Sequence, residues 1–251
     1  MKAAERQLKI RRMFETRDFL DLDTLCRDLE ASDSSVRRDL AVLEAQNILK
    51  RVYGGAVPVQ APASSFDFLT ESERLGDEKR RIARLTATLV EDGQTVILDG
   101  GSTVAAVAAE LVSRSLHVVT NSLPIAEALE LRRNIELTLT GGYLDPRIRV
   151  MLGPLCEQML GSIRADVCIM GCGSVSAGGF SNNNTLVVGS ERKMIEIADR
   201  LIVVADHTKF GRSAMYPVGP LEEADTVVSD QWLSAEYCDL LRSEGIEVLL
   251  A

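Results

Sequence analysis

The stretch SDSSVRRDL, at residues 32–40, places two serines and two arginines where they could contact a nucleic acid. An arginine guanidinium can pair bidentately with guanine or hold a phosphate, and a serine hydroxyl can do either. The candidate contacts in this stretch are Ser34, Ser35, Arg37 and Arg38. The alternative is an ordinary surface helix on which the arginines form ion pairs with Asp33 and Asp39.

A second group of candidate residues follows apolar runs in the rest of the chain. Glycines, hydroxyl groups and short polar side chains occur in DGGST (99–103), TNS (120–122), TGG (140–142), GCGS (171–174) and DHTKFG (206–211). Glycine lets backbone N–H groups approach an anion, and the N-terminus of a following helix adds its positive end. Lys209 supplies a mobile cation. One such stretch is often a turn without a ligand, but the five together suit a phosphorylated small molecule and do not suit a metal.

The first group is positioned by a predicted helix-turn-helix. Apolar residues at helical spacing predict three helices, at about 3–15, 22–30 and 34–46. A short polar break with Ser32 as an N-cap separates the second helix from the third. Because Val36 and Leu40 face inward, the start of the third helix is left exposed, and this part of the motif meets the major groove.

A wing is predicted after the third helix. ILKRVYGGAV, at residues 48–57, is typical of two short strands around a Gly-Gly turn. Lys50 and Arg51 in this wing are candidates for contact with the DNA backbone, which positions a protein without specifying sequence. Residues 1–57 are therefore predicted to form a winged helix-turn-helix DNA-binding domain.

The net charge of −9 does not exclude DNA binding, because the charge is distributed unevenly. Residues 1–57 carry 11 Lys and Arg against 10 Asp and Glu, whereas the remaining residues carry 17 against 27. Charges more than about 8–10 Å away are largely screened at physiological salt. A basic face on the N-terminal domain can therefore bind phosphate although the whole chain is acidic.

The second group is positioned by a predicted α/β domain. Residues 58–76 begin with two prolines and small residues and are predicted to be a linker. In residues 77–251 helical patterns alternate with apolar strands, which indicates a Rossmann-like parallel sheet covered on both faces. Ligands of such sheets lie beyond the carboxyl ends of the strands. We therefore expect the five stretches to converge on one site.

Several other classes of protein lose support. Residues 77–251 have no G-x-G-x-x-G after their first predicted strand, and the chain has no Walker sequence and no G-x-S-x-G, so dinucleotide, nucleoside triphosphate and hydrolase functions are disfavoured. Five irregularly spaced cysteines and two histidines predict reduced, mostly buried thiols and no metal site, and we expect no cofactor. No signal-peptide pattern and no apolar run of about 18 residues occurs, so we expect a cytoplasmic protein without a membrane segment.

The N-terminal pattern resembles the DeoR family of bacterial transcriptional regulators. The family's recognition helix reads S-x-x-T-I-R-R-D-L and is followed by L-x-x-L-x-x-x-G-x-L-x-R-x-H-G-G-A. The present chain has Ser35 for Thr, Val36 for Ile, Asn47 for Gly and Tyr53 for His. By this resemblance Tyr53 is added to the candidate DNA contacts.

The C-terminal motifs resemble the same family. They include ILDGGST, VVTNSL, LTGG, KMIEIA and VVADHTKFGRSA. The resemblance implies a sensor domain related to ribose-5-phosphate isomerase and a sugar phosphate that controls operator binding. It also implies a repressor of a carbohydrate-utilisation operon that acts as a homo-oligomer, a dimer or a tetramer, on double-stranded operator DNA. The residues it assigns to the effector site are Asp99, Gly101, Ser102, Thr103, Asn121, Ser122, Gly141, Gly142, Asp206 and Lys209.

One departure from the family pattern concerns the carboxylates expected near the effector, and an enzymatic alternative stands beside the regulator. The family usually has acidic residues after a GGF stretch, whereas here SNNN follows and the first carboxylate is Glu191. The alternative function is a sugar-phosphate isomerase-like enzyme with an accessory DNA-binding domain, which needs a carboxylate base positioned by a lysine. Its only obvious candidates are Asp99, Glu191, Asp206 and Lys209. We expect no enzymatic activity.

Overall fold

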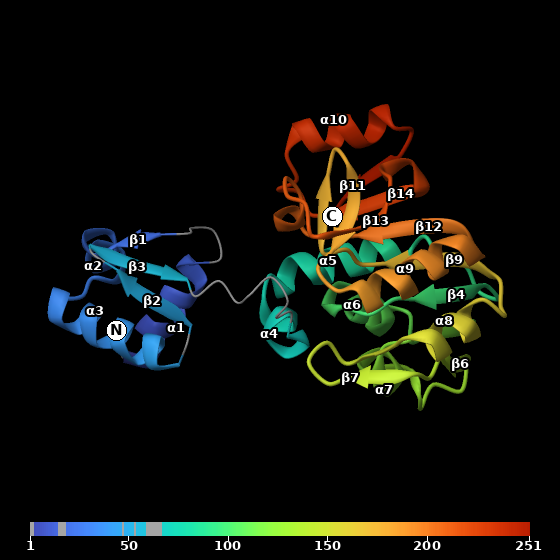
Figure 1. Ribbon diagram of the computed structural model, residues 1–251, viewed down its shortest axis with the longest axis horizontal. Helices are drawn as coiled ribbons and strands as arrows, with labels where there is room; N and C mark the ends of the chain where they lie inside the picture. Colours follow the sequence, from blue (N-terminus) through green and yellow to red (C-terminus); the bar gives the residue numbers. More distant parts are fainter. Residues whose placement is uncertain (1–2, 15–18, 47, 53, 59–66) are drawn as a thin grey trace. The chain divides into compact units, whose positions relative to one another are not determined.

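A computed structural model describes residues 3–14, 19–46, 48–52, 54–58 and 67–251. The chain divides into two compact units, an N-terminal unit at Met1–Ala63 and a C-terminal unit at Ser64–Ala251 (Figure 1). Each unit is described by itself.

The described part of the N-terminal unit contains three helices and a small antiparallel sheet in the order β1-β3-β2. The elements are α1 (Ala3–Met13), β1 (Leu20–Asp21), α2 (Leu22–Leu29), α3 (Asp33–Ala45), β2 (Leu49–Val52) and β3 (Gly55–Pro58). The helix-turn-helix with a wing is therefore confirmed, and β1 is an additional short strand that the sequence patterns did not predict.

Local capping fixes the turn between α2 and α3. Glu30 ends α2 in the left-handed conformation, with φ 49°, and its N–H points back to the last carbonyls of the helix. Ser32 caps α3, because its hydroxyl accepts the N–H of Ser35. Val36, Leu40 and Leu43 of α3 then pack into the core of this unit. The cap and these apolar residues together set which face of α3 is exposed.

The C-terminal unit is built on a seven-stranded parallel sheet in the order β15-β14-β12-β9-β4-β5-β6. The strands are β4 (Thr95–Leu98), β5 (Leu116–Thr120), β6 (Ile135–Leu139), β9 (Ala165–Met170), β12 (Ala198–Val204), β14 (Thr226–Ser229) and β15 (Glu247–Leu250). This sheet confirms the predicted α/β fold class.

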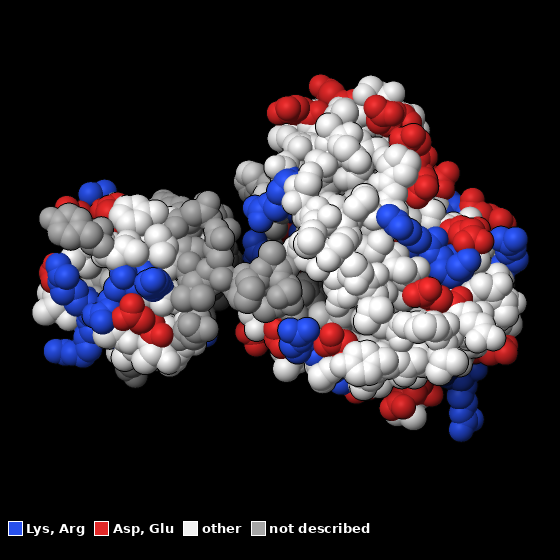
Figure 2. All heavy atoms as spheres, in the orientation of Figure 1, with Lys and Arg blue, Asp and Glu red and all other residues white. Residues whose placement is uncertain are grey.

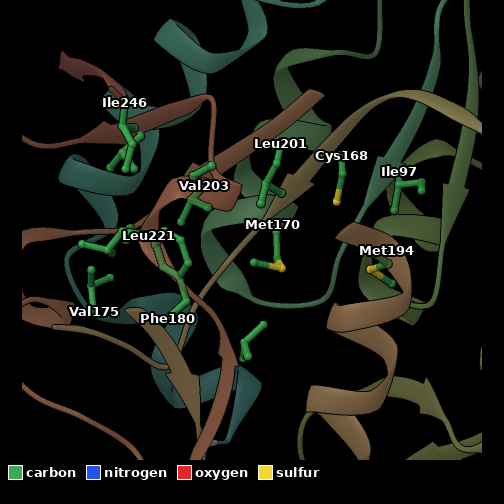
Figure 3. Packing of buried hydrophobic residues seen from close by; sticks show 14 of the residues in the cluster. Ile97, Cys168, Met170, Val175, Phe180, Met194, Leu201, Val203, Leu221 and Ile246 are labelled. Atoms are coloured by element: carbon green, nitrogen blue, oxygen red, sulfur yellow. The ribbon is translucent and has the colours of Figure 1, made fainter. Parts of the chain in front are cut away.

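Helices cover both faces of the sheet. One face packs against α5 (Gly76–Ala87), α6 (Ser102–Glu110) and α7 (Leu123–Leu129), and the other against α8 (Pro154–Leu160), α9 (Thr185–Ile197) and α10 (Ala235–Ser243). Alternate residues of a strand divide between the faces, as Val96 and Leu98 join the first layer and Ile97 joins the second. Figure 3 shows part of the second layer, with Cys168, Met170 and Leu201 near Met194 of α9.

Smaller elements surround the main sheet. They are the hairpin β7 (Tyr143–Asp145) and β8 (Val150–Leu152), the antiparallel sheet β10 (Ser174–Ser176), β11 (Gly179–Asn182) and β13 (Tyr216–Gly219), the short 3-10 helices η1 (His207–Lys209) and η2 (Leu221–Glu223), and the helix α4 (Phe68–Glu73).

The structure differs from the predicted linker of residues 58–76 in its second half. There the chain forms α4 and the beginning of α5 and belongs to the C-terminal unit. Asp67 caps α4, and Phe68 is buried while its N–H donates to the carbonyl of Arg147. The prolines and small residues that favoured a linker all precede this point.

Candidate functional site

The start of α3 presents most of the candidate DNA contacts to solvent. Ser34, Arg37 and Arg38 are exposed and Ser35 is half-buried, whereas Val36 is fully buried beneath them. The helix therefore offers the residue types that the sequence analysis selected, on the face left free by the core.

The two arginines have different partners. Arg37 forms an exposed ion pair with Asp33, with Nε 2.5 Å from Oδ1. Asp39 is buried and accepts from Arg6 Nε at 2.7 Å and from Gln7 at 3.0 Å. Arg38 has no hydrogen bond or ion pair with any residue that the structure describes. Of the two surface ion pairs in the alternative interpretation, only that of Arg37 with Asp33 is formed.

In the wing, Arg51 has an ion-pair partner and Lys50 has none among the described residues. Arg51 is held by Glu44, with Nε 2.6 Å from Oε2 and the backbone N–H 2.9 Å from Oε1. Lys50 is exposed and makes no hydrogen bond or ion pair within the described parts of the chain. Tyr53 lies outside the described residues. Figure 2 shows basic side chains gathered over the part of the N-terminal unit that carries α3 and β2.

In the C-terminal unit, buried polar residues follow the carboxyl ends of β4 and β5. Asp99, Ser102 and Thr103 are at most 9% exposed, and Asn121 and Ser122 are at most 1% exposed. The strand ends approach closely, because a Cβ on Gly100 would lie 3.8 Å from Asn121 Oδ1. Gly101 has a φ of 116° and begins α6 without a side-chain cap, so the first N–H groups of that helix remain available to a ligand.

Several buried polar atoms at this edge have no hydrogen-bond partner among the described residues. They are Asn121 Oδ1, Ser122 Oγ, Glu191 Oε2 and Asp206 Oδ2. Buried polar groups in folded proteins are nearly always hydrogen-bonded, and an unpaired one indicates a missing water or ligand. These atoms, beyond the carboxyl ends of β5 and β12 and on α9, therefore indicate a site for a polar ligand.

A compact ion cluster lies near Asp206. Lys209 Nζ is 3.0 Å from Glu71 Oε1, and Lys79 Nζ is 3.5 Å from the same oxygen. Burial raises the pKa of Glu71, but the charges of Lys209 and Lys79 outweigh it and hold that pKa below its ordinary value. Asp206 has a lowered pKa for the same kind of reason, since Lys209 and Lys79 act on it against the effect of burial.

Asp99 and Glu191 form an acidic pair in the same region. Burial raises the pKa of Asp99 to about 7, against hydrogen bonds from the backbone N–H groups of Gly100 and Gly171. Burial, and then the charge of Asp99, raise the pKa of Glu191 well above its ordinary value. Asn182 Nδ2 donates to Glu191 Oε1 at 2.9 Å and so orients this carboxyl group.

Cys172 connects the ion cluster with the acidic pair. Burial raises the pKa of its thiol to about 12, and the charges of Lys209, Glu191, Asp206 and Asp99 all act on it. Basic and acidic groups therefore belong to one site at the carboxyl edge of the sheet. A thiol with so high a pKa is a weak nucleophile at neutral pH.

Gly141 and Gly142 follow β6, the strand next to β5. They line a cavity of about 450 Å³ with Thr140 and with Leu155, Gln158, Met159 and Ser162 from the region of α8. None of the other predicted effector residues lines this cavity. Gly142 also approaches β8, because a Cβ on it would lie 2.6 Å from the carbonyl oxygen of Leu152, and Val150 of the same strand lies against Gly100.

The comparisons with known proteins cover nearly the whole chain. A family model for the DeoR-like helix-turn-helix domain matches residues 6–61, and one for the DeoR C-terminal sensor domain matches residues 75–231. The chain belongs to the DeoR family. It is therefore a transcriptional regulator of that family, with its helix-turn-helix in the N-terminal unit and its sensor domain in the C-terminal unit.

Curated relatives of this DeoR-family chain are named as repressors. The chain is 32% identical to the HTH-type transcriptional repressor GlcR of Bacillus subtilis, over 98% of this chain and 95% of the relative. It is 31% identical to the glycerol-3-phosphate regulon repressor of Escherichia coli K12, with all of both chains covered. Among solved structures, ribose 5-phosphate isomerase A of Methanocaldococcus jannaschii matches 54% of this chain and 55% of its own, at 19% identity and a TM-score of 0.40.

Two negative findings apply to the described part of this DeoR-family chain. No helix in it has the length and apolar character needed to cross a membrane. No group of three or more His, Cys, Asp or Glu side chains in it could hold a metal ion.

Three residues contribute to the site although the sequence patterns did not predict them, namely Glu71, Arg74 and Lys79. Glu71 and Arg74 were assigned to the linker, so no contact was expected of them. Lys79 carried a usable signal, because it falls on the buried face of α5 with Ile82, Ala83 and Thr86. A lysine on the apolar face of an amphipathic helix needs a buried partner, and that requirement indicates a polar site nearby.

Proposed function

We propose that this DeoR-family regulator represses a carbohydrate-utilisation operon and releases its operator when a phosphorylated sugar binds the sensor domain. Its relatives support the proposal, because curated repressors with these names match it along almost their full length. The observation that carries the effector part is the set of unpartnered buried polar atoms of Asn121, Ser122, Glu191 and Asp206, together with the charges of Lys209 and Lys79 that act on Asp206.

The proposed DNA contacts divide into base contacts and backbone contacts. Arg38, which is exposed and has no described partner, would reach a base edge in the major groove from α3. The same part of α3 carries Ser34, Ser35 and Arg37. To contact DNA, Arg37 must either leave its ion pair with Asp33 or bind a phosphate while it keeps that pair. Lys50, with Arg51 and Tyr53, would hold the phosphate backbone from the wing.

The proposed effector contacts follow from the chemistry of the strand ends. Lys209 and the N–H groups at the start of α6, near Gly101, Ser102 and Thr103, would bind the phosphoryl group. Hydrogen-bond donors and acceptors for the sugar hydroxyls would come from Asn121, Ser122 and Asp206. Asp99 would make a further contact with the sugar beside them. Gly141 and Gly142 are proposed at a second edge of the site, where a cavity would admit part of a larger sugar.

Binding to paired half-sites requires a homo-oligomer, and we propose a dimer or a tetramer. Two DNA-binding domains related by a twofold axis would meet half-sites about one helical turn, or a multiple of it, apart. Sedimentation equilibrium of the full chain checks this proposal, and a monomer at micromolar concentration would contradict it.

A thermal-shift screen with phosphorylated sugars tests the effector part of the proposal. A ligand that binds only the folded protein raises its melting temperature. We expect at least one phosphorylated sugar to stabilise the protein while the corresponding free sugar does not. No stabilisation by any phosphorylated pentose, hexose or polyol would contradict the proposal and would favour a sensor domain that serves only in assembly.

The isomerase-like enzyme is the second candidate function. Asp99, with a pKa of about 7, and the neighbouring Glu191 have the perturbed acidity that general acid–base catalysts often show. Structural carboxyl pairs have the same property, and the curated relatives are named as regulators. We therefore propose no catalysis, and turnover of phosphorylated pentoses or hexoses above background would contradict this.

A further inference from the structure

Glu71 is the ion-pair partner of both lysines at the proposed phosphoryl position. Lys209 Nζ donates to Oε1 at 3.0 Å, and Lys79 Nζ is 3.5 Å from that oxygen and also donates to the backbone carbonyl of Glu71. Arg74 lies 3.8 Å from Oε2. No other carboxylate in the described residues lies within ion-pair distance of Lys79 or Lys209.

Asp206 does not replace Glu71 in this role. Its Oδ1 accepts the hydroxyl and the backbone N–H of Thr208, and its Oδ2 has no described partner. Asp206 lowers the cost of burying the two lysines by its charge, but it makes no direct contact with either. The position next to Lys209 that an anionic ligand would take is therefore held by the carboxylate of α4.

We propose that Glu71 is an internal anion that occupies the phosphoryl position of the ligand-free sensor domain and that a dianionic phosphate monoester displaces it. This inference rests on the proposed function. A carboxylate brings one negative charge, whereas a phosphate monoester at neutral pH brings nearly two and three strong acceptor oxygens. The exchange therefore favours phosphate monoesters and excludes free sugars, which carry no charge to replace that of Glu71.

The displacement would act on the start of the sensor domain. Glu71 lies in α4, the first described element after residue 66, and the chain leads from there back to β3 of the wing. Beyond the Glu71 contacts, α4 is held by buried Phe68, by its N–H bond to Arg147 and by a 3.4 Å bond from Arg74 to Thr208. Loss of the Glu71 contacts weakens this attachment, so ligand binding loosens α4 at the start of the sensor domain.

Isothermal titration of the full chain with inorganic phosphate tests the competition. Glu71→Gln keeps the shape of the side chain and removes its charge, so we expect phosphate to bind about tenfold more tightly than in the wild type. Glu73→Gln is the matched control, because Glu73 is on the same helix, is exposed and has no described partner. It should leave the affinity unchanged. Equal or weaker binding by Glu71→Gln would overturn the inference.

Amide hydrogen exchange of residues 68–73 in the wild type gives a second readout that does not depend on a variant. Phosphate should accelerate exchange of these amides, because it releases Glu71, whereas a ligand that only adds contacts would slow it. Slower or unchanged exchange in α4 at saturating phosphate would also overturn the inference.

The thermal-shift panel separates this inference from the proposed function. If a phosphorylated sugar stabilises the wild type and Glu71→Gln binds it no more tightly, the displacement is wrong and the effector site stands. If neither inorganic phosphate nor any phosphorylated sugar binds either protein, the effector site itself is wrong.

Discussion

Arg37 and Arg38 are neighbours in the sequence but differ in what they can offer to DNA. The guanidinium of Arg37 already has a carboxylate partner, Asp33, whereas that of Arg38 has none among the described residues. A free guanidinium can form a bidentate pair with guanine without first breaking an ion pair. At the residue scale, Arg38 is therefore the stronger candidate for base recognition.

Arg38→Ala should weaken binding to the selected operator by about 1–3 kcal/mol while affecting random DNA much less.

Lys50→Ala should weaken binding to all sequences alike and reduce the salt dependence by about one phosphate contact. Fluorescence anisotropy with an operator selected from random-sequence DNA measures both effects. Arg132→Ala, which removes an exposed charge from the C-terminal unit, is the control. Wild-type affinity in Arg38→Ala would show that this side chain does not read the operator.

Asp99 makes the stability of the sensor domain depend on pH. Its pKa is about 7 in the folded protein and lies near the ordinary 3.8 when unfolded, so the folded state binds more protons between these values. Stability therefore falls as pH rises from about 4 to about 7, and the loss persists above 7.

Asp99→Asn should remove this loss and raise the melting temperature at pH 8 by about 3 °C or more, with a smaller gain at pH 5. Thermal unfolding at the two pH values provides the measurement. Asp199→Asn, at an exposed position of β12, is the control and should leave the pH profile unchanged. An Asp99→Asn variant that is less stable at pH 8 than the wild type would contradict the assignment.

At the scale of elements, the orientation of α3 depends on its N-terminal cap. Ser32→Ala leaves the first N–H groups of α3 without a side-chain acceptor and should cost about 0.5–2 kcal/mol of stability in the N-terminal domain. Ser32→Asp should restore most of it, since aspartate caps helices about as well as serine. Urea unfolding followed by helix content checks both variants. Failure of Asp to restore stability would mean that Ser32 acts by another route.

The main elements were predictable because each carries a local signal. The α2–α3 turn has a capping serine and inward apolar residues at helical spacing, and the strands of the large sheet are apolar runs followed by turn residues. The hairpin β7–β8 and the sheet β10-β11-β13 were missed because they are short and mostly lack such runs. Helix α4 was missed because its stability depends on the contacts of Phe68 and Glu71 with distant residues.

The candidate site was also predictable only in part. Its strand-end residues could be found because parallel strands bring their carboxyl ends to one edge. Strand order was not predictable from local patterns, and therefore neither was which strand ends lie next to each other. Glu71 and Lys79 come from elements that precede the first strand of the sheet, and only tertiary packing brings them to Lys209.

At the scale of the whole molecule, the acidic C-terminal unit and the nearly neutral N-terminal unit have separate tasks. The C-terminal unit carries 17 Lys and Arg against 27 Asp and Glu when counted from residue 58, a balance that disfavours contact between the sensor domain and DNA phosphates. In the proposed function, a ligand at the sheet edge would therefore control DNA binding by α3 and the wing by changing the populations of two arrangements of the chain.

The most direct test measures operator affinity with and without the phosphorylated sugar that stabilises the protein most in the thermal-shift screen. Anisotropy titration of the full chain should show at least a tenfold loss of affinity at saturating ligand, which corresponds to a coupling of about 1.4 kcal/mol. Lys209→Gln should bind the operator as the wild type does and lose this response. Operator affinity that no phosphorylated sugar changes would contradict control of DNA binding by the sensor domain.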